Sequence, residues 1–177
     1  GQDPFTSPDY ARIINDAHFA RLAVLLKQGE IVVGGKTDAE SRYIAPTILD
    51  KISWEHDVMQ DEIFGPILPV LEYENLDDVI TTLRSRPKPL ALYFFSNNPD
   101  NQGKILRETS SGGACINDTL DHMLNNALPF GGVGSSGMGS YHGKASFDTF
   151  SHYKSVLKRA TWLDPPIKYP PYTLPLR

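Results

Sequence analysis

The sequence predicts an α/β fold with a parallel βαβ sheet, and three observations support this. Residues 61–117 alternate between apolar and amphipathic stretches in the order strand, helix, strand, helix, strand. That alternation is typical of βαβ units. Asn75 and Asn98 stand where the N-caps of the two helices are expected. A glycine-rich loop then follows at residues 129–140.

Local patterns predict each element in turn. An apolar stripe that includes Leu22 and Leu25 predicts a helix from residue 9 to about 29. Asn75 and Asp78 resemble a capping box for the helix at 75–84, and Gly112 and Gly113 are expected to end the helix that follows Asn98. Strands are expected at 31–33, 43–49, 66–73, 90–95 and 114–117, a short helix near 143–150, a basic strand at 153–159, and an extended proline-rich tail from 164.

Composition limits the classes of function. The net charge is −4 and the hydrophobic content is 40%, which argues against non-specific binding to nucleic acid. No apolar stretch approaches the roughly 20 residues of a membrane-spanning helix. One cysteine excludes an internal disulfide framework and fits a cytoplasmic setting. The chain begins with Gly rather than Met, so we expect it to have been trimmed or to start within a longer protein.

Glu62 and Phe64 form the first candidate site, just before the Gly65-Pro66 turn. A carboxylate and an aromatic ring at one loop mouth could hold the hydroxyls of a ribose and the plane of a cofactor. The alternative is a surface acid followed by a core phenylalanine, and composition alone favours this alternative.

The glycine-rich loop contains a G-x-G-x-x-G match at Gly132, Gly134 and Gly137. A dinucleotide fingerprint must follow a strand, open a helix at once and find an acid about 20 residues later. Here Pro129 precedes the match, further glycines discourage a helix, and Asp148 comes too early. We therefore expect these glycines to serve close backbone approach rather than phosphate binding.

Cys115 and the histidines offer little independent chemistry. Cys115 lies in an apolar strand with no base or cation adjacent in sequence, so we expect an inert, structural thiol. The histidine spacings do not predict a metal site. His122 is the one histidine of interest, because it lies between a strand end and the glycine-rich loop, where sites form in α/β folds.

These segments resemble the aldehyde dehydrogenase superfamily. Three blocks occur in the family's order: QDEIFGPI at 60–67, SSGG with ND at 110–118, and PFGGVGSSGMG at 129–139. The class 3 branch is the most similar. Its likeness extends over nearly the whole chain through SPDY and RIIN at 7–15, RYIAPT at 42–47, KPLALY at 88–93, YHGK at 141–144 and SFDTFSH at 146–152.

The resemblance implies a C-terminal part of an enzyme that oxidises aldehydes to carboxylates with NAD or NADP. It implies that Glu62 holds the nicotinamide-side ribose, that Phe64 packs near the nicotinamide, and that Asn117 and His122 lie near the aldehyde pocket. The nucleophile, the general base and the dinucleotide-binding half are expected upstream, so the chain holds no catalytic residue. Cys115 does not match the nucleophile.

The resemblance also implies a division of the chain and a homodimer in the full enzyme. Residues 1–140 would belong to the catalytic domain, and 141–177 would form a linker helix, an oligomerisation strand and the tail. We expect the isolated chain to be inactive. Two alternatives remain: a stand-alone module that binds nucleotide or pairs with a full subunit, and a remnant without function.

Overall fold

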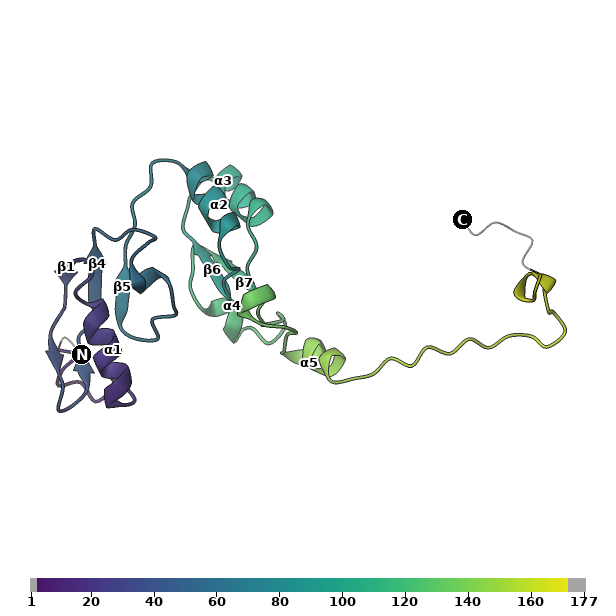
Figure 1. Ribbon diagram of the computed structural model, residues 1–177, viewed down its shortest axis with the longest axis horizontal. Coiled ribbons are helices and arrows are strands. Elements are labelled where there is room, and N and C mark those ends of the chain that lie inside the picture. The colour runs from purple at the N-terminus through teal and green to yellow at the C-terminus, as the bar shows by residue number, and fades with distance from the viewer. Residues whose placement is uncertain (1–2, 172–177) are drawn as a thin grey trace. The chain divides into compact units, whose positions relative to one another are not determined.

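The computed structural model describes residues 3–171 (Figure 1). The chain divides into two compact units, the first ending at Val79 and the second beginning at Ile80. This division by internal contacts does not test the functional division at residue 140, which stays a prediction. The elements of the first unit are α1 (Asp16–Leu25), β1 (Glu30–Val33), β2 (Thr37–Asp38), β3 (Tyr43–Ile44), β4 (Thr47–Asp50), η1 (Asp57–Met59) and β5 (Ile67–Pro69).

The larger sheet of the first unit has the strand order β1-β4-β5, and β2 and β3 form a separate two-stranded sheet. β1 pairs with β4 antiparallel, with Ile31 opposite Leu49. β5 pairs with β4 parallel, with Thr47 opposite Ile67. The strand predicted at 43–49 is split because Pro46 interrupts it, and β5 ends at Pro69, which lacks the N–H that a ladder requires.

Helix α1 begins at Asp16, seven residues later than the pattern predicts (16 against 9). Its true start is set by Asn15, whose side chain accepts a hydrogen bond from the His18 N–H at 2.8 Å. Ile13 instead donates its backbone N–H to the Arg42 carbonyl at 3.0 Å, outside the helix. The capping interaction therefore overrides the apolar periodicity.

The core of the first unit forms between α1 and the sheet. Leu22 and Leu49 are completely buried, and Ile44 and Val58 are nearly so. Around them lie the other members of one apolar cluster, Leu25, Leu26, Ile52 and Ile67. The helix thus presents one leucine-rich stripe to the core, and the polar residues His18 and Arg21 lie beside that stripe.

The second unit is built on one βαβ motif. Strands β6 (Ala91–Phe94) and β7 (Gly113–Ile116) pair in parallel, and α3 (Pro99–Glu108) connects them. The Asn98 side chain caps α3 by accepting from the Asp100 and Asn101 N–H groups. The remaining elements are α2 (Leu76–Ser85), which crosses the unit boundary, α4 (Asp121–Leu124), η2 (Gly134–Ser136), α5 (Gly143–Thr149) and η3 (Pro166–Lys168).

The predicted run of strands and helices at 61–117 is confirmed in its order and in the parallel pairing of its last two strands. Its first strand, β5, pairs with β4 rather than with β6. Asn75 caps this helix as predicted, since the Asp78 N–H donates to its side chain at 2.9 Å, and the Asp78 carboxylate accepts from the Asn75 side-chain amide rather than from its backbone N–H. α3 ends at Glu108, before the glycine pair, and Gly113 opens β7 instead.

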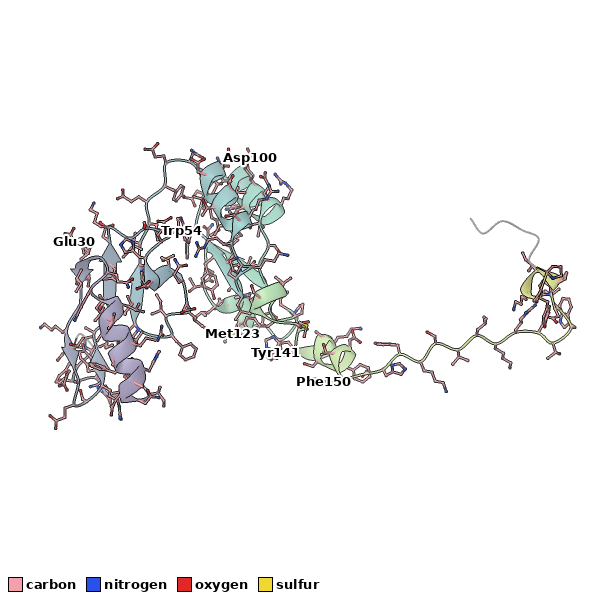
Figure 2. All side chains as sticks on the ribbon, in the orientation of Figure 1. Glu30, Trp54, Asp100, Met123, Tyr141 and Phe150 are labelled. Carbon is pink, nitrogen blue, oxygen red and sulfur yellow. The ribbon has the colours of Figure 1, made fainter. Side chains whose placement is uncertain are left out.

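In this single chain no strand is assigned at 153–159 within residues 3–171, and the oligomerisation strand expected there stays a prediction. A strand exists only through hydrogen bonds to a neighbour, and nothing in the described chain pairs with this segment. Val156 and Leu157 are 75% and 90% exposed, and Phe150 before them is 87% exposed (Figure 2). The tail that follows carries one short 3-10 turn, η3, and residues 172–177 lie outside the described part.

No helix within residues 3–171 combines the length and the apolar character needed to cross a membrane.

Leu22 offers a direct test of this core. We expect Leu22→Ala to lower the free energy of unfolding by about 2–5 kcal/mol, because it leaves a cavity among buried side chains. Val24 on the same helix is 57% exposed, so Val24→Ala should cost less than about 1 kcal/mol. Urea unfolding followed by circular dichroism measures both. Equal losses would contradict the placement of Leu22 in the core.

Candidate functional site

An exposed loop of residues 62–66, the 62–66 loop, connects η1 to β5 in the first unit. Phe64 has a φ of 49° and is 78% exposed, and Glu62 is also exposed. A bulky residue in the left-handed region is unusual and must be held by its surroundings. The reading of Phe64 as a core residue, which composition favoured, is therefore wrong.

Side chains of α1 hold the backbone of this loop. Arg21 donates from Nη2 to the Glu62 carbonyl at 3.2 Å and also to the Ile63 carbonyl. His18 donates from Nε2 to the Phe64 carbonyl at 2.8 Å. Three consecutive carbonyls are thus bound to one helix, while the Glu62 and Phe64 side chains remain exposed.

The Gly65-Pro66 turn fixes the other end of the 62–66 loop. A β-carbon on Gly65 would lie 2.6 Å from Leu22 Cδ1, so only glycine fits against this buried side chain. The Pro66 carbonyl accepts a hydrogen bond from the Thr47 N–H at 2.9 Å, at the start of β4. Beside the turn lies an open, largely apolar groove of about 390 Å³ that is lined by the turn and by residues of β1, β4 and β5.

The loop can therefore bind a ligand with a polar and a planar part. An exposed carboxylate accepts hydrogen bonds from hydroxyl groups, and it is stronger as an acceptor than a neutral group. An exposed aromatic ring packs on another planar ring. Both groups stand on a backbone that is already fixed, which limits the entropy lost on binding.

In the second unit, Asn117 joins the ends of β6 and β7. Its Oδ1 accepts the Ser96 N–H at 2.7 Å, and its Nδ2 donates to the Ser96 carbonyl at 3.0 Å. Its own N–H donates to the Phe94 carbonyl at 2.9 Å. Asn117 has a φ of 58°, a conformation that asparagine tolerates better than most residues. The side-chain amide is thus engaged in holding the carboxyl ends of both strands.

His122 lies on α4, which folds back against β7. Its Nδ1 is 3.2 Å from Cys115 Sγ, so the fold gives the thiol a neighbouring base that its sequence neighbours do not supply. Cys115 is buried at 9% exposure, as predicted. The seven-residue separation carried no signal, because the contact depends on the turn at Leu120, which has a φ of 66°.

The His122 ring is enclosed by aromatic and backbone neighbours. Tyr93 and Phe130 contact it edge-on, with ring centroids 5.8 and 5.5 Å away. A β-carbon on Gly113 would lie 2.6 Å from its Cδ2, so the ring lies directly over β7. Its Nε2 is buried and has no hydrogen-bond partner within residues 3–171.

The glycine-rich loop is closed at its base by a two-way hydrogen-bonded bridge between Phe130 and Tyr141. A β-carbon on Gly132 would lie 2.1 Å from the Ser136 carbonyl oxygen, which confirms that close backbone approach requires the glycine. The three-residue η2 turn stands where a dinucleotide fingerprint would open a helix.

The structure groups the predicted site residues in two pairs, each within one unit. Glu62 and Phe64 share the 62–66 loop, and Asn117 and His122 follow the carboxyl end of β7. Sequence reasoning missed His18 and Arg21. Their spacing of three residues, which places both on one helix face, was the available signal. Within the described residues, no group of three or more His, Cys, Asp or Glu side chains could hold a metal ion.

Substitutions of Asn117 test its hydrogen bonds at the carboxyl ends of β6 and β7. We expect Asn117→Ala to lower the free energy of unfolding by about 1–3 kcal/mol, because it loses two hydrogen bonds and keeps a left-handed backbone. Asn117→Gly loses the same bonds but adopts that conformation freely, so it should cost less. Urea unfolding of both variants measures the difference. A glycine variant less stable than the alanine variant would contradict the backbone part of this account.

Comparison with known proteins agrees with this geometry. The model of the aldehyde dehydrogenase family matches residues 3–156. The 4,4'-diaponeurosporen-aldehyde dehydrogenase of Staphylococcus aureus (strain NCTC 8325 / PS 47) is 51% identical over 174 residues, which cover 97% of this chain and 38% of that protein. Aldehyde dehydrogenase family 3 member B1 of Homo sapiens is 50% identical over 173 residues, which cover 97% and 37%.

Solved structures give the same result. The substrate-bound state of Staphylococcus aureus AldH superposes with a TM-score of 0.86 at 51% identity, covering 97% of this chain and 38% of that one. An NAD-dependent aldehyde dehydrogenase from Sinorhizobium meliloti gives 0.76 at 26% identity, covering 86% and 32%. The chain spans well under half the length of these relatives. The family match and the half-identical relatives show that the chain belongs to the aldehyde dehydrogenase family, in its class 3 branch.

Proposed function

We propose that this chain forms part of an NAD(P)-dependent aldehyde dehydrogenase that oxidises aldehydes to carboxylates. The observation that carries the proposal is the 62–66 loop. It keeps Glu62 and Phe64 exposed on a backbone bound to α1, with Phe64 in a left-handed conformation. Strain of this kind concentrates at ligand sites, and it supports a binding role for the loop.

Glu62 and Phe64 fit the nicotinamide end of NAD or NADP. The carboxylate of Glu62 would accept hydrogen bonds from two neighbouring ribose hydroxyls, and the exposed Phe64 ring would pack near the nicotinamide. When bound, the cofactor accepts the hydride that the substrate loses. The protein's part is to hold the ribose and keep the ring plane in place.

Asn117 and His122 belong near the aldehyde pocket in this proposal. The buried His122 Nε2 has no hydrogen-bond partner among the described residues, which supports placing this ring at the wall of the pocket. Asn117 contributes through its hold on the Ser96 peptide, which fixes the strand ends that carry the pocket.

The reacting thiol, the general base and the dinucleotide-binding half are expected in the remainder of a longer protein, which we propose to be a cytoplasmic homodimer. Cys115 is not the nucleophile, because it is buried beneath the neighbouring ring of His122 and reactive thiols need access. The isolated chain is accordingly expected to be inactive.

The first test uses the full-length protein that carries this sequence. Glu62→Gln and Phe64→Ala are each expected to raise the KM for NAD or NADP about tenfold, because each loses contact with one part of the cofactor. The KM for the aldehyde should change little. Steady-state kinetics with both substrates varied gives these values. Asp61→Asn, at a neighbouring exposed acid, is the matched control, and unchanged cofactor KM values in both site variants would contradict the assignment.

The second test uses the isolated chain. Titration calorimetry with NAD is expected to show no saturable heat at micromolar concentration, because Glu62 and Phe64 contact only one end of the cofactor. Saturable binding would instead favour a stand-alone nucleotide-binding module over a part of a larger enzyme.

A further inference from the structure

We propose that His18 and Arg21 on α1 are positioning residues for the cofactor, acting through the backbone of the 62–66 loop. The inference rests on the proposed function, since it assigns these two side chains a part in NAD(P) binding. Neither side chain needs to touch the cofactor. Their effect is to fix the loop from which Glu62 and Phe64 are presented.

Helix α1 presents the two donors as a pair. The Asn15 cap fixes the start of the helix at the turn that contains His18. Arg21 lies three residues further on and therefore on the same face. Leu22 and Leu25, both buried in the core, lie at i+4 and i+7 from His18 and therefore on the same side of the helix. The positions of the donors are thus set by the same packing that stabilises the first unit.

The two side chains also bind one another. Arg21 donates from Nε to His18 Nδ1 at 3.4 Å. With Nδ1 as the acceptor, a neutral His18 carries its proton on Nε2, where it is donated to the Phe64 carbonyl at 2.8 Å. Arg21 therefore selects the histidine tautomer that the loop requires, and the two residues work as a unit.

The need for these donors follows from the loop backbone. Three successive carbonyls, those of residues 62–64, bond to the Arg21 and His18 side chains. This arrangement coincides with a left-handed Phe64, at a φ of 49°. In the absence of the donors these carbonyls would turn to water, and Phe64 would return to a favoured region of backbone space. The Glu62 and Phe64 side chains would then no longer project from a fixed backbone.

Gly65 adds a second constraint from the same helix. Its close approach to Leu22 leaves no room for a β-carbon. Apolar packing thus fixes the C-terminal end of the 62–66 loop, and the His18 and Arg21 hydrogen bonds fix its N-terminal end. Removal of the donors should therefore free residues 62–64 without detaching Gly65 or β5.

The experiment compares three variants in the full-length protein: Arg21→Met, which keeps the aliphatic stem; Arg21→Lys, which keeps a cationic donor; and His18→Gln, which keeps one donor and one acceptor. Lys27→Met is the control, since Lys27 is an exposed cation just beyond α1. Two quantities are measured: the KM values for NAD(P) and aldehyde, and amide hydrogen exchange by peptide.

We expect Arg21→Met to raise the KM for NAD(P) about fivefold, as the loss of hydrogen bonds from an exposed cation implies. The aldehyde KM should change less than about twofold. Exchange should quicken in peptides covering 60–66 and stay unchanged in β4. Arg21→Lys, which keeps a cationic donor, should raise the KM for NAD(P) less than Arg21→Met does. His18→Gln, which keeps one donor and one acceptor, should also raise it less. The double variant Arg21→Met, His18→Gln should raise this KM by less than the product of the two single effects.

The outcomes separate the inference from the proposed function. A wild-type protein without NAD(P)-dependent aldehyde oxidation would overturn the proposed function. An active wild-type protein with unchanged cofactor KM and unchanged exchange in Arg21→Met would overturn the inference alone. Equal rises in both KM values, with faster exchange throughout the first unit, would show a purely structural role and would also overturn it.

Discussion

The burial of Leu22 is the contact on which the first unit depends. Its side chain is completely excluded from solvent, and it lies within the cluster that joins α1 to β4 and β5. It also sets the separation between the helix and Gly65. Because that separation is fixed, His18 and Arg21, which lie beside Leu22 on the helix surface, come within hydrogen-bonding reach of the 62–66 loop. Core packing and loop geometry are therefore parts of one arrangement rather than independent features.

Much of the fold follows from the sequence because it rests on short-range chemistry. The Asn98 cap, the β6-α3-β7 order and the compact glycine loop each depend on neighbouring residues, and each is found in the structure. The start of α1 was mistaken because apolar periodicity extends past Asn15, whereas the cap ends the helix there. No strand is assigned at 153–159 in the single chain, because extended propensity alone cannot supply a hydrogen-bonded neighbour.

The candidate site residues could likewise be predicted from the sequence only in part. The residue types at Glu62 and Phe64 could be recognised from a sequence block, but composition placed Phe64 in the core and the structure exposes it. The backbone conformation of Phe64 accounts for its exposure, and no single-residue preference predicts a phenylalanine at positive φ. The contact between Cys115 and His122 also lay beyond the sequence, because it requires α4 to turn back over β7.

That contact has a practical use in spectroscopy. The chain contains one cysteine, and its sulfur lies 3.2 Å from His122 Nδ1. Isotopic labelling of cysteine in this chain would give a single carbon resonance beside the ring, without introducing any foreign group. Because the sulfur is close to Nδ1, the resonance should move when the ring changes its position or its plane. Cys115 is therefore an internal NMR reporter beside His122, the residue proposed to lie near the aldehyde pocket.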